Sequence, residues 1–338
     1  MNVQGTVGGY KAVAKLYNAL MTGLVLTLVT RVSETAARDF VFAHFRRQHL
    51  EKFKDGLVKL GLDKLPHAVA CAQYHALSNA VGGVRTEYIY ESDRKAWVRY
   101  PPPRWIWQGA AICAVPRSVN EAMLHGWHGH NGVTLGNPRL GFVCTGETVN
   151  GDPGLEGYYY EYDRDIAPEE RVRFAFDEVA PPYDPAKAPK LDSASWPEER
   201  LQKVERSYAM EYVRSMLPSL ESVLGEAGFV QLGRAARLIG LQTYADAADL
   251  LGVTERSPES FAMLLAGLAA AQGERVSVDG ATVTQAGGRL MDGVALRDGA
   301  AAFAAWNALW KGMLAVHDRT LTLESALTAD GIVWRVTR

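Results

Sequence analysis

A proline-rich segment near the middle of the chain is the feature that most restricts its fold. Between residues 181 and 197, five prolines stand among Asp, Ala, Lys and Ser, a composition typical of a linker. The chain of 338 residues has room for two hydrophobic cores. We therefore expect one folded unit over residues 35–180, a linker over 181–197 and a second unit over 198–338.

The first half changes its hydrophobic period along the chain. Apolar side chains first recur at steps of three and four, which predicts helices, and then alternate with polar ones, which predicts strands. The expected order is two helices, a hairpin, a third helix and a second hairpin, over residues 33–62, 66–80, 87–100, 118–130 and 140–162.

The second half predicts the same kinds of element in a similar order. Three helices are expected first, over residues 198–227, over 234–251 and from 257. A hairpin around Asp279-Gly280 (275–284), a helix (300–316) and a closing hairpin (321–337) are expected to follow. An Asp-Gly pair between alternating segments favours a two-residue hairpin turn. The sequence thus predicts an α+β fold of two similarly patterned helix–helix–hairpin–helix–hairpin units with antiparallel sheets, related by internal duplication.

An apolar run at residues 20–29 follows Lys11 and Lys15. It is shorter than the roughly 20 residues that span a bilayer, and no small-residue cleavage site precedes Arg31. We expect a packed N-terminal helix within residues 1–34. A contact with a partner or a membrane surface, and a signal sequence, are the alternatives.

Charge and cysteine content restrict the possible partners and the compartment. The 36 basic and 38 acidic residues nearly cancel, and no basic stripe favours nucleic-acid binding. Three cysteines, Cys71, Cys113 and Cys144, predict free thiols in a reducing, cytoplasmic setting. No membrane span is expected, and a homo-oligomer is possible.

Three of the eight histidines, His125, His128 and His130, fall within six positions. The first two would share a helix face, and the third could turn toward them. Three imidazoles could hold a divalent metal with a position open for water. The alternative is a helix end, where histidines favour the dipole. The sequence requires no cofactor.

Other polar residues of the first half could carry acid–base or thiol chemistry. His67 and His75 lie eight residues apart on the second helix, where either a core role or a general-base role is possible. Cys144 could act as a nucleophile if a histidine formed its thiolate, or it could be a small buried side chain. Glu161, on the last strand, could be a pocket carboxylate or an exposed strand residue.

Aromatic side chains of the first half could form a stacking surface for a flat ligand. Four of them are candidates for substrate binding, Trp97, Trp105, Trp127 and Tyr159. Arg104 could hold a substrate carboxylate. Packing in the core is the alternative role of the aromatic residues.

The stretch Arg139–Thr145, followed by the Gly-Asp turn and aromatic strand of Gly151–Tyr160, resembles the L-2-amino-thiazoline-4-carboxylic acid hydrolase family. The order of elements is similar to that of 4-vinyl-reductase-like ligand-binding domains, and the resemblance covers roughly residues 35–165. It implies a hydrolase that opens a C–N bond of a small cyclic substrate. The two cysteines of the family pattern are replaced here by Pro101–Trp105 and Gly157–Tyr160.

Two functions follow as hypotheses. The first is a small-molecule hydrolase in which His75, His128, His130 and Cys144 carry the chemistry and a histidine acts as general base. The second is a non-catalytic protein that binds a small cyclic molecule in an aromatic cavity. In either case the second half would be a scaffold or a degenerate copy, because it contains one histidine, His317, and no cysteine.

Overall fold

The computed structural model describes residues 1–104, 106–191, 194 and 196–338. The chain folds into two compact units. The central unit is Val32–Pro197, and the split unit joins Met1–Arg31 to Glu198–Arg338. The N-terminal helix therefore belongs with the second half of the chain, and the proline-rich segment belongs to the central unit.

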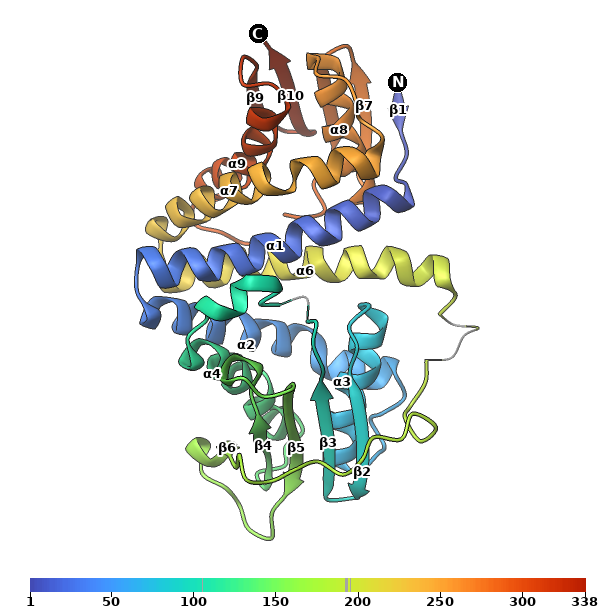
Figure 1. Cartoon of the computed structure of the whole chain (residues 1–338), viewed down its shortest axis with the longest axis vertical. Helices are drawn as coiled ribbons and strands as arrows, with labels where there is room; N and C mark the ends of the chain where they lie inside the picture. Colours follow the sequence, from blue (N-terminus) through green and yellow to red (C-terminus); the bar gives the residue numbers. More distant parts are fainter. Residues whose placement is uncertain (105, 192–193, 195) are drawn as a thin grey trace. The chain divides into compact units, whose positions relative to one another are not determined.

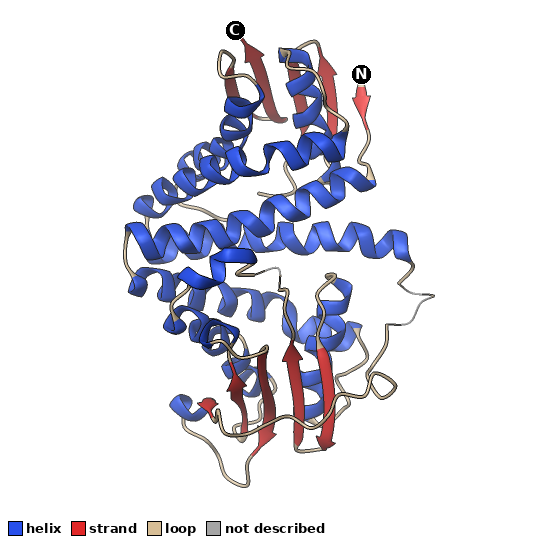
Figure 2. Ribbon diagram, in the orientation of Figure 1, coloured by secondary structure: helices blue, strands red, loops and turns tan. Residues whose placement is uncertain are grey.

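The central unit combines helices with one sheet (Figures 1 and 2). Its helices are α2 (Glu34–Lys59), α3 (His67–Val81), α4 (Arg117–Gly126) and the one-turn α5 (Asn131–Thr134). Its strands are β2 (Glu87–Ser92), β3 (Lys95–Tyr100), β4 (Leu140–Gly146), β5 (Leu155–Glu161) and β6 (Val172–Phe174). In the described residues the sheet has the order β2-β3-β5-β4-β6. The predicted α+β class is confirmed.

Alternation along β5 places consecutive tyrosines on opposite faces of this sheet. Tyr159 faces α3, where its hydroxyl lies beside His75. Tyr158 packs against Trp97 on the other face. The chain that follows β6 crosses this second face (Figure 1) and covers it with Ala175, Ala180 and Tyr183. Both faces of the sheet are therefore packed.

Local signals explain where the helices of the central unit begin and end. Ser33 caps α2, because its hydroxyl accepts a hydrogen bond from the Ala36 amide at 3.0 Å. The helix predicted over residues 118–130 ends at Gly126, and a 3₁₀ turn, η2 (His128–His130), continues the chain. Gly126 packs so closely on α2 that an added Cβ would lie 2.8 Å from the Phe42 carbonyl oxygen.

The split unit has long helices and a second sheet. Its helices are α1 (Val7–Arg31), α6 (Glu198–Leu224), α7 (Glu226–Leu251), α8 (Pro258–Ala271) and α9 (Gly299–His317). Its strands are β1 (Asn2–Val3), β7 (Arg275–Asp279), β8 (Thr282–Ala286), β9 (Thr322–Thr328) and β10 (Gly331–Thr337). Among the described residues the sheet is antiparallel throughout, in the order β1-β7-β8-β10-β9.

The two units share an order of elements. In the central unit α2, α3, the β2–β3 hairpin, α4 and the β4–β5 hairpin follow one another, and in the split unit α7, α8, the β7–β8 hairpin, α9 and the β9–β10 hairpin do so. The order of the four hairpin strands is also the same, since β2-β3-β5-β4 corresponds to β7-β8-β10-β9. The repeated pattern in the sequence therefore reflects a repeated topology.

Besides the early end of the helix predicted over 118–130, two other details of the predicted fold are wrong. The sheet of the central unit is mixed rather than antiparallel, because β6 pairs in parallel with β4. In the split unit α7 begins at Glu226, eight residues before the predicted start at 234, and only Gly225 separates it from α6. Gly225 permits this abrupt turn because its φ of +57° is a conformation that glycine adopts without strain.

Helix α1 is longer than the apolar run at residues 20–29 suggested. It has 25 residues and packs against α6 and α7 within the split unit. Of the described helices, α1 alone is long and apolar enough to cross a membrane, and two thirds of its most apolar stretch is buried. The three cysteines are free, with Cys71 and Cys144 buried and Cys113 exposed.

Candidate functional site

A buried cluster around the Tyr159 hydroxyl brings several predicted site residues together. His75 Nε2 lies 2.8 Å and His128 Nδ1 lies 2.7 Å from the hydroxyl oxygen. The Asn131 amide donates to the same oxygen at 3.0 Å. A tyrosine hydroxyl has one proton, so it donates to one imidazole and accepts from the other imidazole and from Asn131. These three partners use its full hydrogen-bonding capacity.

Burial keeps the imidazoles of this cluster neutral. Desolvation lowers the pKa of His75 to about 3 and holds the pKa of His128 well below its usual value. Desolvation also raises the pKa of Tyr159 well above its usual value. The two imidazole rings stack with centroids 4.4 Å apart, so no ligand fits between them. A histidine with so low a pKa is a weak general base at neutral pH.

His49, Trp127 and His130 extend the cluster toward α2. The His49 ring lies 5.4 Å from the Trp127 ring and 5.3 Å from the His130 ring, centroid to centroid. Desolvation lowers the pKa of His49 to about 3 and that of His130 to about 4. Each of these residues has a buried ring nitrogen with no hydrogen-bond partner among the described residues. Such unpaired atoms are uncommon in protein interiors.

Two other predicted residues lie away from this cluster. Trp97 packs on the opposite face of the sheet, where its indole N–H donates to Glu91 at 2.6 Å. Cys144 is buried, and its thiol donates to the Gly146 carbonyl at 3.5 Å. Burial, and then the neighbouring Glu147 carboxylate, raise the pKa of this thiol. A raised pKa opposes thiolate formation, so the geometry does not favour Cys144 as a nucleophile.

Arg104 lies at the border of the cluster. Its guanidinium stacks over the Tyr100 ring at 5.2 Å, and that ring contacts His75 and His128 at 6.1 and 6.3 Å between centroids. Trp105 lies outside the described residues. Arg104 therefore lies close to the predicted site, just beyond the end of β3.

The three clustered histidines do not come together as metal ligands. His125 is exposed, whereas His128 is buried and bonded to Tyr159. They diverge because the helix ends at Gly126, between them. Within the described part of the chain, no group of three or more His, Cys, Asp or Glu side chains is placed to hold a metal ion.

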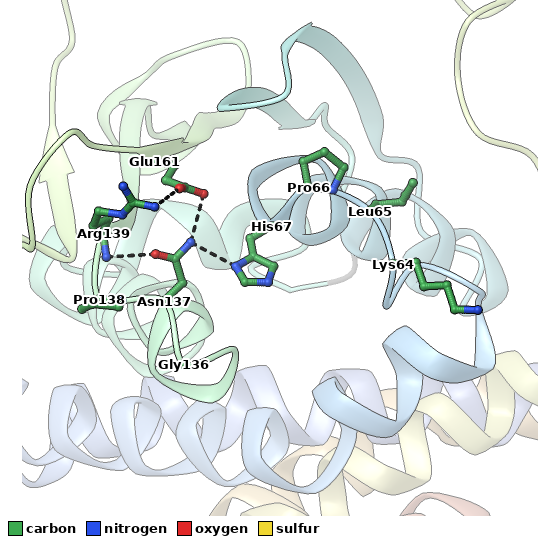
Figure 3. Close-up of a pocket in the computed structure, with 9 residues that line it drawn as sticks. All are labelled: Lys64, Leu65, Pro66, His67, Gly136, Asn137, Pro138, Arg139 and Glu161. Carbon is green, nitrogen blue, oxygen red and sulfur yellow. Dashed lines mark hydrogen bonds and ion pairs between the residues drawn. The ribbon is translucent and has the colours of Figure 1, made fainter.

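A groove of about 550 Å³ opens at the start of α3. One wall is the segment from Lys64 to His67, and the other combines the loop Gly136–Arg139 with Glu161 at the end of β5 (Figure 3). The Arg139 guanidinium pairs with Glu161 at 2.8 Å. Unlike the cluster around Tyr159, this groove places ionisable side chains where a dissolved molecule can reach them.

Asn137 fixes the orientation of the polar groups in the groove. Its side-chain oxygen accepts the Arg139 backbone N–H at 3.1 Å, so its NH₂ group must face the other way. That group donates to His67 Nδ1 and to Glu161 Oε2, both at 3.0 Å. A neutral His67 that accepts at Nδ1 carries its proton on Nε2. The groove thus presents an N–H donor and a carboxylate acceptor.

Sequence reasoning identified only part of this groove. His67 and Glu161 were candidates in the sequence, but the site was expected at His75, the later histidines and Cys144. Asn137 and Arg139 lie in the short loop before β4 and form no motif with either residue. The one usable signal was Asn137-Pro138, a dipeptide that favours a turn at an element boundary. Which boundaries meet in space depends on the strand order.

The equivalent end of the split unit is closed by hydrogen bonds. His317, at the end of α9, contacts the Ser257 carbonyl through Nε2 at 2.9 Å and the Tyr244 hydroxyl through Nδ1 at 2.9 Å. Arg256 donates to the Val316 carbonyl at 3.0 Å. Because the Ser257 carbonyl can only accept, Nε2 carries the proton and cannot act as a base toward the nearby Ser260.

Comparison of this chain with models of protein families, with curated proteins and with solved structures finds no match. The resemblance to the thiazoline carboxylate hydrolase family therefore stays a prediction from the sequence.

Proposed function

We propose that the central unit binds a small polar molecule in the groove between α3 and the end of β5. The single observation that carries this proposal is the Glu161–Asn137–His67 array, which lines a groove of about 550 Å³. Ligand pockets of this size combine a shaped cavity with a few fixed polar groups. The rival aromatic-cavity hypothesis has less support, because Trp97 and Tyr159 are buried in packed layers.

The array also limits the chemistry of the ligand. His67 Nε2–H offers a donor, and each Glu161 oxygen keeps a lone pair beside its contact with Arg139 or Asn137. A molecule that carries both a carbonyl-type acceptor and an N–H donor complements these two groups. Amides, cyclic amides and amidines have both within one functional group.

Binding is tested by the thermal stability of the full chain with a panel of small cyclic amides and amidines. A compound that binds should raise the melting temperature of the unmodified protein, because it stabilises the folded state. Glu161→Gln should abolish that rise, whereas Asp163→Asn should keep it. Asp163 is a suitable control because its carboxylate is exposed and pairs with Arg94 outside the groove. Equal rises in both variants would refute the proposed site.

A second candidate function is hydrolysis of a C–N bond in a small cyclic substrate, as the family resemblance implies. The observation that favours it is again the paired donor and carboxylate. Glu161 would take a proton from water as the water oxygen bonds to the amide or amidine carbon. His67 Nε2–H would stabilise the negative charge that develops on the substrate heteroatom. Glu161 would then return the proton to the nitrogen as the C–N bond breaks.

Turnover of 2-amino-thiazoline-4-carboxylate and of hydantoin tests this second function. Glu161→Gln should lower the rate about a hundredfold or more, because it removes the general base. His67→Ala should also lower the rate, because it removes the N–H donor. His125→Ala, the matched control, should leave the rate unchanged, since His125 is exposed and does not line the groove. Binding without turnover would leave the first proposal standing and exclude the second for these substrates.

We further propose that the two units arose by duplication of one ancestral unit. The shared order of helices and of hairpin strands supports this proposal. In that case the split unit has kept the topology and carries other buried contacts, such as Tyr17 with Gln272, in place of the histidine cluster. Its role would be that of a scaffold, with the chemistry retained in the central unit.

A further inference from the structure

The sheet of the split unit ends in an open strand, β9. In the order β1-β7-β8-β10-β9, this strand lies at one edge, whereas β1 covers the edge of β7 at the other (Figure 1). One side of β9 pairs with β10 along its seven residues. Among the described residues, no backbone hydrogen bond joins its other side to another segment. A row of N–H and C=O groups therefore points away from the sheet.

The equivalent edge of the central unit is occupied. In the shared strand order β9 corresponds to β4, and β6 pairs with the outer side of β4. The Phe142 N–H of β4 donates to the Arg171 carbonyl, and the Cys144 carbonyl accepts the Ala175 N–H, both at 2.9 Å. This topology thus binds an added strand at this position wherever one is supplied, and the described residues of the split unit supply none.

Strand β9 lacks the features that protect a free edge from pairing. Edge strands are commonly protected by Lys, by Pro or by a bulge that distorts the strand. β9 contains neither residue, and its pairing with β10 shows no shift of register. The edge strand of the central unit, β2, does have such a shift, between Tyr90 and Ser92. Of these two edges, β9 is therefore the better suited to accept a strand.

The side chains of β9 are complementary to a second copy of the same strand. Leu323, Ser325 and Leu327 share one face of the sheet, because each lies opposite a buried residue of β10. Leu323 is buried, whereas Leu327 is 65% exposed. An antiparallel copy with its Ser325 opposite this Ser325 would place its own Leu323 opposite Leu327. The exposed apolar side chain would thus gain an apolar neighbour.

The one charge on the strand favours the same register. Glu324 lies opposite Arg335 of β10, and in the register centred on Ser325 it would face Ala326 of the other copy. A register centred on Glu324 would place two carboxylates directly opposite each other, which is unfavourable. The register centred on Ser325 also pairs the whole length of both strands, so it is the favoured one.

We propose that β9 pairs in antiparallel fashion with β9 of a second copy of this chain. A two-fold axis at Ser325 relates the copies and joins their sheets into one continuous sheet. One strand pair buries less surface than the roughly 1,200–2,000 Å² of a stable complex, so the dimer is weak and depends on concentration. This interface is separate from the groove and does not depend on the function proposed there.

Sedimentation velocity of the full chain between about 1 and 100 µM tests the dimer. The weight-average mass should rise from that of one chain toward that of two. Ala326→Glu should weaken the dimer about fivefold, because a new carboxylate would face Glu324 of the other copy at two equivalent places. Ala326→Lys should strengthen it by a similar factor, because the new charge is opposite to that of Glu324.

Further variants separate this interface from other surfaces. Leu327→Lys should weaken the dimer about tenfold or more, whereas Thr284→Glu should leave it unchanged, because Thr284 is exposed on the interior strand β8. Equal melting temperatures would show that the variants fold alike, as expected for exposed positions. A mass of one chain up to about 100 µM refutes the proposal. It is also wrong if a dimer forms and neither Ala326 variant changes its affinity, since the contact would then lie elsewhere.

Discussion

The central and split units arrange helices and strands in one order but bury different chemistry. At the centre of the first sheet, Tyr159 bonds two imidazoles and an amide. In the second sheet, Trp334 of the equivalent strand makes one hydrogen bond, from its indole N–H to Asn307 at 2.7 Å. One topology therefore accommodates, on equivalent strands, an aromatic side chain with three hydrogen-bond partners or one with a single partner. The side chains, and not the fold, decide where chemistry can occur.

The two units also differ in what they leave open. The central unit has a groove at the start of α3, whereas Arg256 and His317 close the equivalent end of the split unit. The sheet face away from the helices shows the opposite difference, because it is covered in the central unit and open in the split unit. Residues 175–183 cover that face in the central unit, while Ser277, Thr284 and Arg335 are exposed in the split unit. The two units therefore share a topology but expose different parts of it to solvent.

Acid pH should produce the largest difference in stability between the two units. His49, His75 and His128 are buried, and their pKa values in the folded chain lie well below the 6.5 of an unfolded chain. The folded state thus binds fewer protons, so stability is complete above pH 6.5 and falls as the pH drops toward 3. The loss is about 1.4 kcal/mol per pH unit for each histidine, or about 4 kcal/mol at pH 5.5.

Hydrogen exchange resolved by peptide, after equilibration in urea at pH 7.5 and pH 5.5, measures this loss in each unit. The central unit should unfold at much lower urea concentration at the acid pH. The split unit has one histidine, His317, and should shift less. Equal shifts in the two units would remove the histidine explanation.

Close helix packing should give the next largest effect, this time in the split unit. A Cβ on Gly240 would lie 2.0 Å from the Leu309 carbonyl oxygen, between α7 and α9. The corresponding pair of helices in the central unit packs less closely, at 2.8 Å between a Cβ on Gly126 of α4 and the Phe42 oxygen of α2. Gly240→Ala should therefore cost about 3 kcal/mol and Gly126→Ala about 1 kcal/mol in urea unfolding. A larger cost for Gly126→Ala would contradict the comparison.

Removing the central hydroxyl should have the smallest of these effects. Tyr159→Phe leaves Asn131 and one imidazole N–H without an acceptor, which should cost about 2 kcal/mol. Asn307→Leu leaves one indole N–H unpaired and should cost about 1 kcal/mol. Chemical denaturation of both variants provides the measurement. If the two costs are equal, the additional hydrogen bonds of the Tyr159 hydroxyl contribute nothing to stability.

Hydrophobic periodicity predicted most of the elements but not their detailed pairing. The turn at Asp279-Gly280 and the change of period at residue 87 identified two hairpins correctly. Strand β6 was missed because Val172–Phe174 is too short to show a period, and its pairing with β4 is long-range. The helix break after Gly126 depends on contact with α2, which local sequence does not encode.

The candidate site was predictable to a similar degree. Three residues that the sequence singled out, His75, His128 and Tyr159, do meet in the fold. Alternation along β5 implied two faces, but only the tertiary fold decides that Trp97 and Tyr159 lie on opposite ones. The groove was not predicted because its walls come from a loop, a helix start and a strand end.

The position of α1 has a consequence for synthesis on the ribosome. This apolar helix packs against α6 and α7, which are translated only after the whole central unit. At about 5–20 residues per second, α1 waits on the order of ten seconds or more before its partners emerge. During that interval its apolar side chains, with Leu20, Leu24 and Leu28 among them, must stay exposed or be held by something else. The nascent chain should therefore be a substrate for chaperones until residue 198 and the helices beyond it have been made.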